Sequence, residues 1–291
     1  MMKKLRYMLE AFALGLVFIL FKLMPPAAAS SCGGWIGRTA GPRLAASRKA
    51  RANLTEAYPG KSAADINGII AAMWDNLGRV MAEYPHLKTI IHEYTDISGE
   101  ENLFALGKDS PCIIIGGHLA NWELLPFYFN YRIDWPLAGL FRAPNNPYTA
   151  WILNRARNPE RRGAYIPKSA KGARAIVNTL KEGERLGILI DQKYNEGIAV
   201  PFFERPAMTS PSFAQLARRY DVPVLPLRVR RRKEKFGFEI MIYQPFHIGG
   251  DISDEEAVLK AHHMLEEWIG ERPGEWLWLH RRWAGMPARA V

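Results

Sequence analysis

The clearest indication of how this chain folds is the stretch PCIIIGGHLANWELLPF, residues 111–127. It opens with the short apolar run Cys112–Ile115, continues through two glycines, and takes on a helical pattern near Asn121. Continuous apolar runs are typical of strands that are buried on both faces of a parallel sheet. The stretch therefore predicts a buried strand, a glycine turn and a helix, with His118 directly after the strand.

The alternation of strands and helices continues on both sides of this stretch. Before it, a polar, glycine-containing connection runs to about Gly60. This order predicts an α/β fold with a mostly parallel central sheet flanked by helices. Apolar periodicity, turn residues and capping residues predict helices over 62–81, 170–181, 210–219 and 253–269, and strands over 186–190, 222–229, 236–243 and 276–279.

The N-terminal segment, MMKKLRYMLEAFALGLVFILFKLMPP, combines a basic start with an apolar core. A membrane-spanning helix needs about 20 apolar residues. The uninterrupted run Ala11–Phe21 is shorter, and only a segment that includes Glu10 and Lys22 approaches that length. A membrane anchor and a cleavable signal peptide ending near Ala27–Ala29 both fit the pattern. A lipoprotein box ending at Cys32 fits less well, because an alanine stands where such boxes favour leucine.

Composition and charge narrow the class of protein. The 291 residues are 48% hydrophobic, which is enough for a sizeable core, and they carry a formal net charge of +10. Such an excess attracts polyanions, among them nucleic acid, anionic lipid headgroups and acidic carrier proteins. No recognisable nucleic-acid-binding motif accompanies the arginine clusters, so we predict no nucleic-acid partner. With only two cysteines, a disulfide framework is not expected and a reducing compartment fits.

His118 and Glu123 form the pattern that carries chemistry. On a regular helix their spacing would not place the two side chains on one face. With His118 in the turn and Glu123 in the first helical turn, a hydrogen bond between them becomes feasible. A carboxylate on one ring nitrogen fixes the tautomer and leaves the other nitrogen as a general base. A purely structural histidine in a strand-to-helix loop is the alternative, and these residues alone do not separate the two.

Three polar residues, His118, Asp191 and His280, each follow a predicted strand. In parallel sheets the reactive groups gather at the carboxyl ends of the strands, so this edge of the sheet is the predicted site. No metal site is predicted. A zinc-binding helix would need two histidines four positions apart, whereas His262 and His263 are adjacent and face different sides.

The segment from Gly116 to Glu123 resembles the histidine, four residues, acid signature of the glycerolipid (lysophospholipid) acyltransferase superfamily. More specifically, the chain resembles the lipid A biosynthesis acyltransferases, the lauroyl and myristoyl transferases of Gram-negative bacteria. The order and spacing of the matching segments make the resemblance specific over most of the chain. These segments are GGHLANWE, FRAPNNP, RGAYIPKSAKGAR, LKEGERLGILIDQK, VPFFERPAMTS and WLHRRW.

The resemblance implies a role for each matching residue. His118 would be the general base and Glu123 its partner. A hydroxyl on the acceptor lipid would attack the thioester of an acyl carrier protein, with no covalent enzyme intermediate and no other cofactor. Relatives often carry a second acid or a histidine where this chain has Lys193. The resemblance therefore implies a role for Asp191 and for no further residue of this segment. The implied substrate-binding residues are Arg142, Arg157, Asp191, Arg205 and Arg281.

The resemblance also implies where the protein works. Because acyl carrier protein is cytosolic, the N-terminal segment is expected to stay as an anchor over residues 1–28. It would hold a single α/β domain, residues 29–291, at the cytoplasmic side of the cell inner membrane. The expected partners are acyl carrier protein, an anionic glycolipid acceptor of the lipid A pathway and the membrane itself. The alternatives are another glycolipid or lysophospholipid acceptor, and a non-catalytic membrane-tethered binder of anionic polymers.

Overall fold

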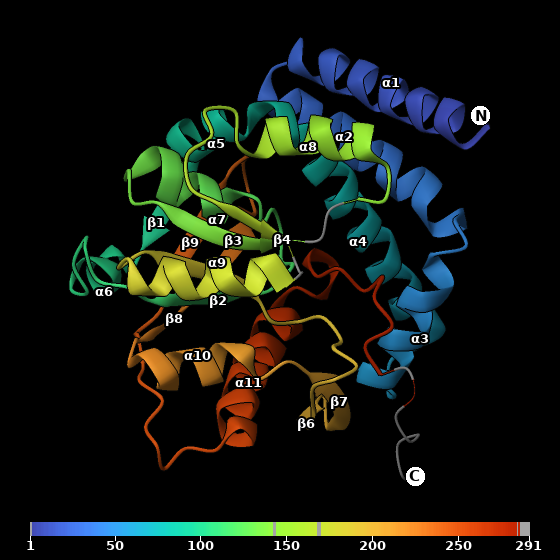
Figure 1. The fold of residues 1–291 in the computed structure, drawn as a ribbon. Helices are drawn as coiled ribbons and strands as arrows, with labels where there is room; N and C mark the ends of the chain where they lie inside the picture. Colours follow the sequence, from blue (N-terminus) through green and yellow to red (C-terminus); the bar gives the residue numbers. More distant parts are fainter. Residues whose placement is uncertain (1, 142–143, 168–169, 284, 286–291) are drawn as a thin grey trace.

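The computed structural model describes residues 2–141, 144–167, 170–283 and 285 (Figure 1). At its centre is a seven-stranded sheet with the order β1-β9-β8-β2-β5-β3-β4, and β6 pairs with β7 in a separate two-stranded sheet. The strands are β1 (Thr95–Ser98), β2 (Ile113–Gly116), β3 (Leu137–Phe141), β4 (Tyr165–Pro167), β5 (Arg185–Leu189), β6 (Ile198–Phe202), β7 (Arg205–Thr209), β8 (Val224–Arg231) and β9 (Phe238–Ile242).

Strand β2 occupies the middle of the large sheet, and all of its residues are buried. Ile113 and Ile115 belong to one hydrophobic core, whereas Ile114 belongs to another, because successive side chains of a strand point to opposite faces. The strands β8, β2, β5, β3 and β4 are parallel, while β9 is antiparallel to β8 and parallel to β1. The predicted α/β fold with a mostly parallel sheet is confirmed.

Helices cover both faces of this sheet. Phe213 of α10 and Leu265 of α11 pack in the core that holds Ile113, and Ile90 of α5 and Leu124 of α7 pack in the core that holds Ile114. The helical segments are α1 (Met2–Lys22), α2 (Pro26–Ala40), η1 (Gly41–Arg43), α3 (Ser47–Ala57), α4 (Ala63–Glu83), η2 (Tyr84–His86), α5 (Leu87–Glu93), α6 (Glu100–Phe104), α7 (Leu124–Phe127), η3 (Tyr128–Arg132), α8 (Pro147–Arg157), α9 (Ala170–Lys181), α10 (Ser212–Tyr220), α11 (Asp254–Glu271) and η4 (Pro273–Glu275).

Capping residues that are visible in the sequence begin two of the long helices. Ser62 accepts a hydrogen bond from the backbone of Asp65 at the start of α4, and Ser253 forms the predicted capping box with Glu256 at the start of α11. Each box satisfies two backbone N–H groups that would otherwise lack a partner. The predicted helices over 62–81 and 253–269 are confirmed.

One local prediction is wrong. Residues 276–279 form no strand: apart from one bridge between Leu119 and Trp276, this segment serves to bury the side chains of Trp276 and Trp278. The polar, glycine-containing stretch before Gly60, for which the sequence predicted no helix or strand, contains α2 and α3. Its glycines permit close helix packing, because a Cβ on Gly33 would overlap the backbone carbonyl oxygen of Gly78 on α4.

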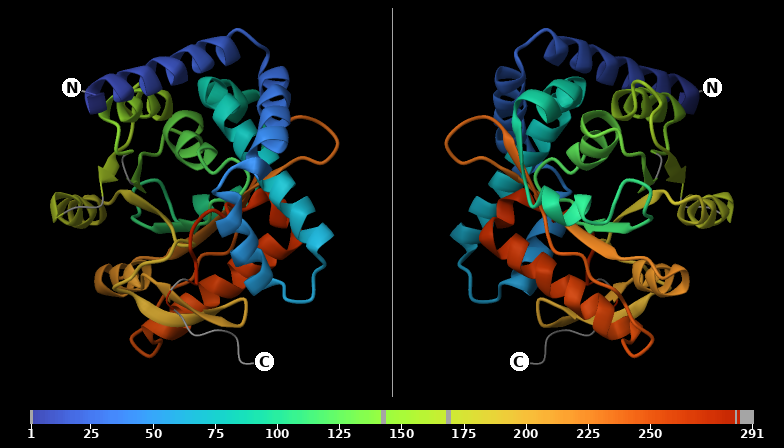
Figure 2. Two further views of the ribbon diagram at one scale, coloured as in Figure 1. Left: turned by 90° about the vertical axis from the view of Figure 1, so that its right-hand side faces the viewer. Right: turned by 90° about the vertical axis from the view of Figure 1, so that its left-hand side faces the viewer.

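Helix α1 lies along one end of the molecule, against α8 (Figures 1 and 2). The side chain of Asn146, the N-cap of α8, donates to the backbone oxygen of Tyr7 and to Glu10. Within the described residues no helix is both long enough and apolar enough to cross a membrane. The spanning form of the anchor predicted over residues 1–28 is therefore not supported, since charged residues lie inside α1 and interrupt its apolar sequence.

Candidate functional site at the carboxyl end of the sheet

The site begins where β2 and β5 end side by side. These strands are parallel, and Gly116 of β2 pairs with Leu189 of β5. His118 and Asp191 therefore leave the sheet at the same edge, as predicted. The backbone N–H of His118 donates to Asp191 Oδ2 at 2.8 Å, and His118 Nδ1 lies 2.8 Å from Asp191 Oδ1. A third donor, the indole N–H of Trp276, reaches Asp191 Oδ2 at 2.7 Å.

These contacts fix the charge of Asp191 and the tautomer of His118. Burial opposes the ionised form of Asp191, but the interaction with His118 and the hydrogen bonds from His118 and Trp276 outweigh it and lower the pKa of Asp191 well below its usual range. An ionised carboxylate only accepts hydrogen bonds. His118 Nδ1 must therefore carry a hydrogen, which leaves the lone pair of a neutral imidazole on Nε2.

The Nε2 atom of His118 faces Gln192, which also contacts His280. Gln192 Nε2 lies 3.1 Å from His118 Nε2 and 3.0 Å from His280 Nε2, and the two imidazole centroids are 5.9 Å apart. His118, Asp191 and His280 come together at this sheet edge, although the segment before His280 is not the strand that the sequence predicted. Gln192 was not predicted as a site residue, although it follows Asp191 directly in the sequence.

Glu123 does not make the hydrogen bond with His118 that the sequence suggested. Its carboxylate accepts from Arg157 Nε and Nη2 at 2.9 and 2.6 Å, from the Tyr84 hydroxyl at 2.7 Å, and from the Trp122 indole at 3.2 Å. Glu123 is the N-cap of α7, and there it meets groups from α8 and η2. The acid that bonds to the His118 ring is the one after the neighbouring strand, Asp191.

Glu123 nevertheless reaches His118 through one intermediate side chain. The Trp122 ring packs edge-on against the His118 ring, with centroids 5.1 Å apart, while its indole nitrogen donates to Glu123. Burial opposes the charge of Arg157, but Glu123 raises the pKa of the guanidinium above its ordinary value. Burial and the Glu123 charge raise the pKa of Tyr84 well above 10, so its phenol stays protonated and donates to Glu123.

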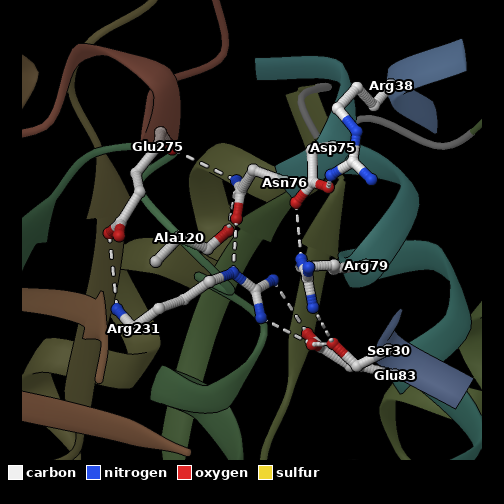
Figure 3. A network of polar contacts seen from close by, with 9 residues as sticks. All are labelled: Ser30, Arg38, Asp75, Asn76, Arg79, Glu83, Ala120, Arg231 and Glu275. Carbon is white, nitrogen blue, oxygen red and sulfur yellow. Dashed lines mark hydrogen bonds and ion pairs between the residues drawn. The ribbon is translucent and has the colours of Figure 1, made fainter. Parts of the chain in front are cut away.

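Ala120, in the loop between His118 and Glu123, contacts a network of polar residues (Figure 3). Ala120 has a φ of 48°, a conformation that is costly for a residue with a Cβ. Its N–H donates to the backbone oxygen of Glu275 at 2.9 Å, and its carbonyl accepts from Asn76 at 3.0 Å. Tertiary contacts on both sides of the peptide therefore stabilise the strained residue.

The same network contains a buried charge pair. Glu83 is fully buried and accepts from Arg231 at 2.6 and 3.0 Å, from Ser30 at 2.6 Å and from Asn121 at 2.7 Å. Because Asn121 belongs to the His118 loop, this pair fixes the loop as well as neutralising the buried carboxylate. Neither Glu83 nor Arg231 was predicted, because nothing in the local sequence around either residue links it to the loop.

The remaining predicted substrate-binding residues lie in different surroundings. Arg157 is paired with Glu123, Arg205 is buried and paired with Glu56, and Arg281 is exposed directly after His280. Arg142 lies outside the described residues. No group of three or more His, Cys, Asp or Glu side chains that could hold a metal ion occurs in the part of the chain that the structure describes.

Beside the site lies the buried Arg282. Its guanidinium donates to the backbone oxygen of Met208 at 2.9 Å and to Thr209 Oγ1 at 2.7 Å, and lies 3.1 Å from His262 Nε2. Burial, partly offset by Asp191, lowers the pKa of Arg282 to about 10. Burial and the charge of Arg282 lower the pKa of His262 to about 3, so this histidine is neutral. The pair joins the C-terminal segment to β7 and α11.

Comparison with known proteins gives the family. The bacterial lipid A biosynthesis acyltransferase model matches residues 1–284. The lipid A biosynthesis palmitoleoyltransferase of Escherichia coli (strain K12) is 27% identical over 294 residues, which is 97% of this chain and 93% of that protein. The lipid A biosynthesis lauroyltransferase of the same organism is 23% identical over 253 residues, covering 81% and 80% of the two chains.

Among solved structures, the 1-acyl-sn-glycerophosphate acyltransferase PlsC of Thermotoga maritima aligns with 78% of this chain and 94% of that chain. The alignment has 14% identity and a TM-score of 0.37, which is too distant to inform the site. The family resemblance drawn from the sequence motifs is confirmed by the match that spans nearly the whole chain. The chain belongs to the bacterial lipid A biosynthesis acyltransferase family.

Proposed function

We propose that this acyltransferase moves a fatty acyl chain from the thioester of an acyl carrier protein to a hydroxyl of a lipid A precursor, with His118 as the general base. The observation that carries the proposal is the contact between His118 Nδ1 and the ionised Asp191, which leaves Nε2 with a lone pair at the carboxyl edge of the sheet. We assign Asp191 as the positioning acid for this base, in place of the predicted Glu123.

In this mechanism His118 Nε2 takes the proton of the acceptor hydroxyl while the hydroxyl oxygen attacks the thioester carbonyl carbon. The carbon–sulfur bond then breaks, and the leaving thiolate takes the proton back from His118. Asp191 stabilises the imidazolium that exists between these two proton transfers. Cys112 is not a rival nucleophile, because burial raises the pKa of its thiol to about 12 and it precedes β2, at the strand end opposite His118.

The charge of the chain supports the proposed partners. A net charge of +10 attracts both the phosphates of a lipid A precursor and an acidic acyl carrier protein, and it speeds their encounter with the enzyme. Arg281 is exposed next to His280 and is our candidate for contact with a substrate phosphate. A guanidinium suits this role because it keeps its charge at any physiological pH and offers a fork of donors.

Helix α1 is our candidate for contact with the inner membrane. Several of its large apolar side chains face solvent: Leu5, Leu9, Phe12, Leu16, Ile19 and Leu20 are each about half exposed or more. Trp35 of α2 and Trp151 of α8 are also exposed, at 59% and 70%. An apolar helix face with basic residues at one end is typical of a helix that lies in the membrane interface. Because the proposed donor, acyl carrier protein, is cytosolic, we place this contact at the cytoplasmic face of the membrane.

A defined reaction tests the proposal. Purified enzyme would receive an acyl-loaded carrier protein and a lipid A precursor in mixed micelles, and mass spectrometry would identify the acylated lipid. We expect acyl transfer by the wild type and near-total loss in His118→Ala. Transfer to a lysophospholipid and to no lipid A precursor would contradict the proposed acceptor. Full transfer by His118→Ala would overturn the general base.

A further inference from the structure

The carboxamide of Gln192 sits between two histidines at the edge of the site. Its nitrogen lies 3.1 Å from His118 Nε2 and 3.0 Å from His280 Nε2, and all three side chains are partly buried. Gln192 follows Asp191 at the end of β5, whereas His280 comes from the C-terminal segment. Two separate parts of the chain therefore converge on the nitrogen that the proposed mechanism uses as the base.

The direction of these hydrogen bonds follows from Asp191. Because the carboxylate requires a hydrogen on His118 Nδ1, the neutral ring presents a lone pair on Nε2, and only a donor can lie against it. The NH₂ group of Gln192 has two hydrogens, one for His118 and one for His280. His280 Nε2 therefore also accepts, and it holds the carboxamide over the base.

The Gln192 nitrogen thus occupies the position next to His118 Nε2 that an attacking hydroxyl or water molecule would need. A group that gives its proton to a general base approaches to about 2.6–3.2 Å. Gln192 already occupies that shell of His118 Nε2, at 3.1 Å. A water molecule and the Gln192 amide cannot both bond to the single lone pair, so His118 cannot activate water while the amide is in place.

We propose that Gln192, held by His280, is a cap that restricts the base to its lipid acceptor and suppresses hydrolysis of the acyl donor. The inference rests on the proposed function, because it presumes a thioester donor. The acceptor hydroxyl displaces the amide with the binding energy of the rest of the lipid, which water does not have. Gln192 is in this sense a positioning residue that selects between two nucleophiles for one base.

The reaction that the cap suppresses is a simple one. His118 Nε2 removes a proton from water, the oxygen attacks the thioester carbonyl carbon, and the carbon–sulfur bond breaks. The thiolate then takes the proton from His118, so that the products are a free fatty acid and the carrier thiol. Transfer and hydrolysis share the donor and the base and differ only in the oxygen that attacks.

The rate at which free fatty acid is released from the acyl carrier protein, with and without the acceptor lipid, tests the cap directly. Gln192→Ala should hydrolyse the donor about ten-fold faster than the wild type when no acceptor is present, because one hydrogen bond of about 1.4 kcal/mol sets that factor. His280→Ala should change hydrolysis in the same direction by a smaller factor. The double variant His118→Ala, Gln192→Ala should hydrolyse no faster than buffer, since the base is gone.

The outcomes separate this inference from the function on which it rests. Gln215→Ala, a matched change at an exposed glutamine of α10, should leave hydrolysis unchanged. If the wild type transfers no acyl chain, the proposed function fails. If the wild type and a folded Gln192→Ala both transfer while hydrolysis stays at the wild-type rate, the cap is wrong. Circular dichroism and the melting temperature establish that each variant is folded.

Discussion

Replacing Asp191 by asparagine is the sharpest test of which acid serves His118. In the wild type, Asp191 Oδ2 accepts from two N–H groups whose hydrogens cannot move, the His118 backbone and the Trp276 indole, while Oδ1 faces His118 Nδ1. Asparagine has one oxygen and one NH₂ group. Its oxygen must take the Oδ2 position, because an NH₂ group there would face two donors.

The NH₂ group of the substituted side chain would then point at His118 Nδ1 and force that nitrogen to accept. The neutral ring can comply only by moving its hydrogen to Nε2, which removes the lone pair that the mechanism needs. An asparagine that imposes the wrong tautomer on a catalytic histidine lowers kcat by about 10⁴ in serine proteases. We therefore expect a loss of about 10³–10⁴ in kcat for Asp191→Asn, or about 4–5 kcal/mol in the barrier.

Steady-state acyl transfer gives kcat and KM, and ¹⁵N NMR of labelled histidine reports the tautomer. We expect hydrogen on Nδ1 of His118 in the wild type and on Nε2 in Asp191→Asn. Asp134→Asn, at an exposed aspartate, is the matched control and should behave as the wild type. The reasoning is refuted if Asp191→Asn keeps the Nδ1 tautomer and transfers within a few-fold of the wild type. A larger loss in Glu123→Gln would then restore the acid that the sequence suggested.

Three further predictions concern stability and membrane contact. Glu83→Ala should lower the free energy of unfolding by about 3–5 kcal/mol in urea titrations, because it strands the Arg231 charge, whereas Glu239→Ala in a more exposed pair should cost about 1 kcal/mol or less; similar losses in both variants would contradict this. The pKa of His262 is lowered to about 3, so below pH 6.5 the unfolded state binds a proton that the folded state does not bind. The free energy of unfolding should therefore fall by about 2 kcal/mol between pH 6.5 and 5. An equally steep loss in His262→Gln would exclude this origin. Phe12→Asp combined with Leu16→Asp should weaken sedimentation with anionic vesicles at least about ten-fold without lowering the melting temperature, because both side chains are exposed on α1; undiminished sedimentation would remove α1 from the membrane contact.

The sequence could predict the sheet, its parallel character and the edge where the site lies, because these depend on local apolar runs and turn residues. It could not predict which acid bonds to His118. Glu123 is near in the sequence, but the side chain that faces Nδ1 comes from the end of the neighbouring strand, and strand order is a non-local property. For the same reason Glu83 and Arg231, which are 148 positions apart, gave no signal as a pair.

The role of Trp276 explains both the wrong strand prediction over 276–279 and the hydrogen bonding of the site. The apolar and aromatic residues there resemble a strand, but the Trp276 ring is buried and its indole nitrogen is used as a donor to Asp191. A buried tryptophan needs such a partner, and a buried carboxylate needs several donors. The segment thus completes the hydrogen bonding of the acid and, four residues later, delivers His280 to Gln192. The C-terminal motif is therefore part of the immediate environment of His118, which explains why a motif so far from His118 in the sequence belongs to the same pattern.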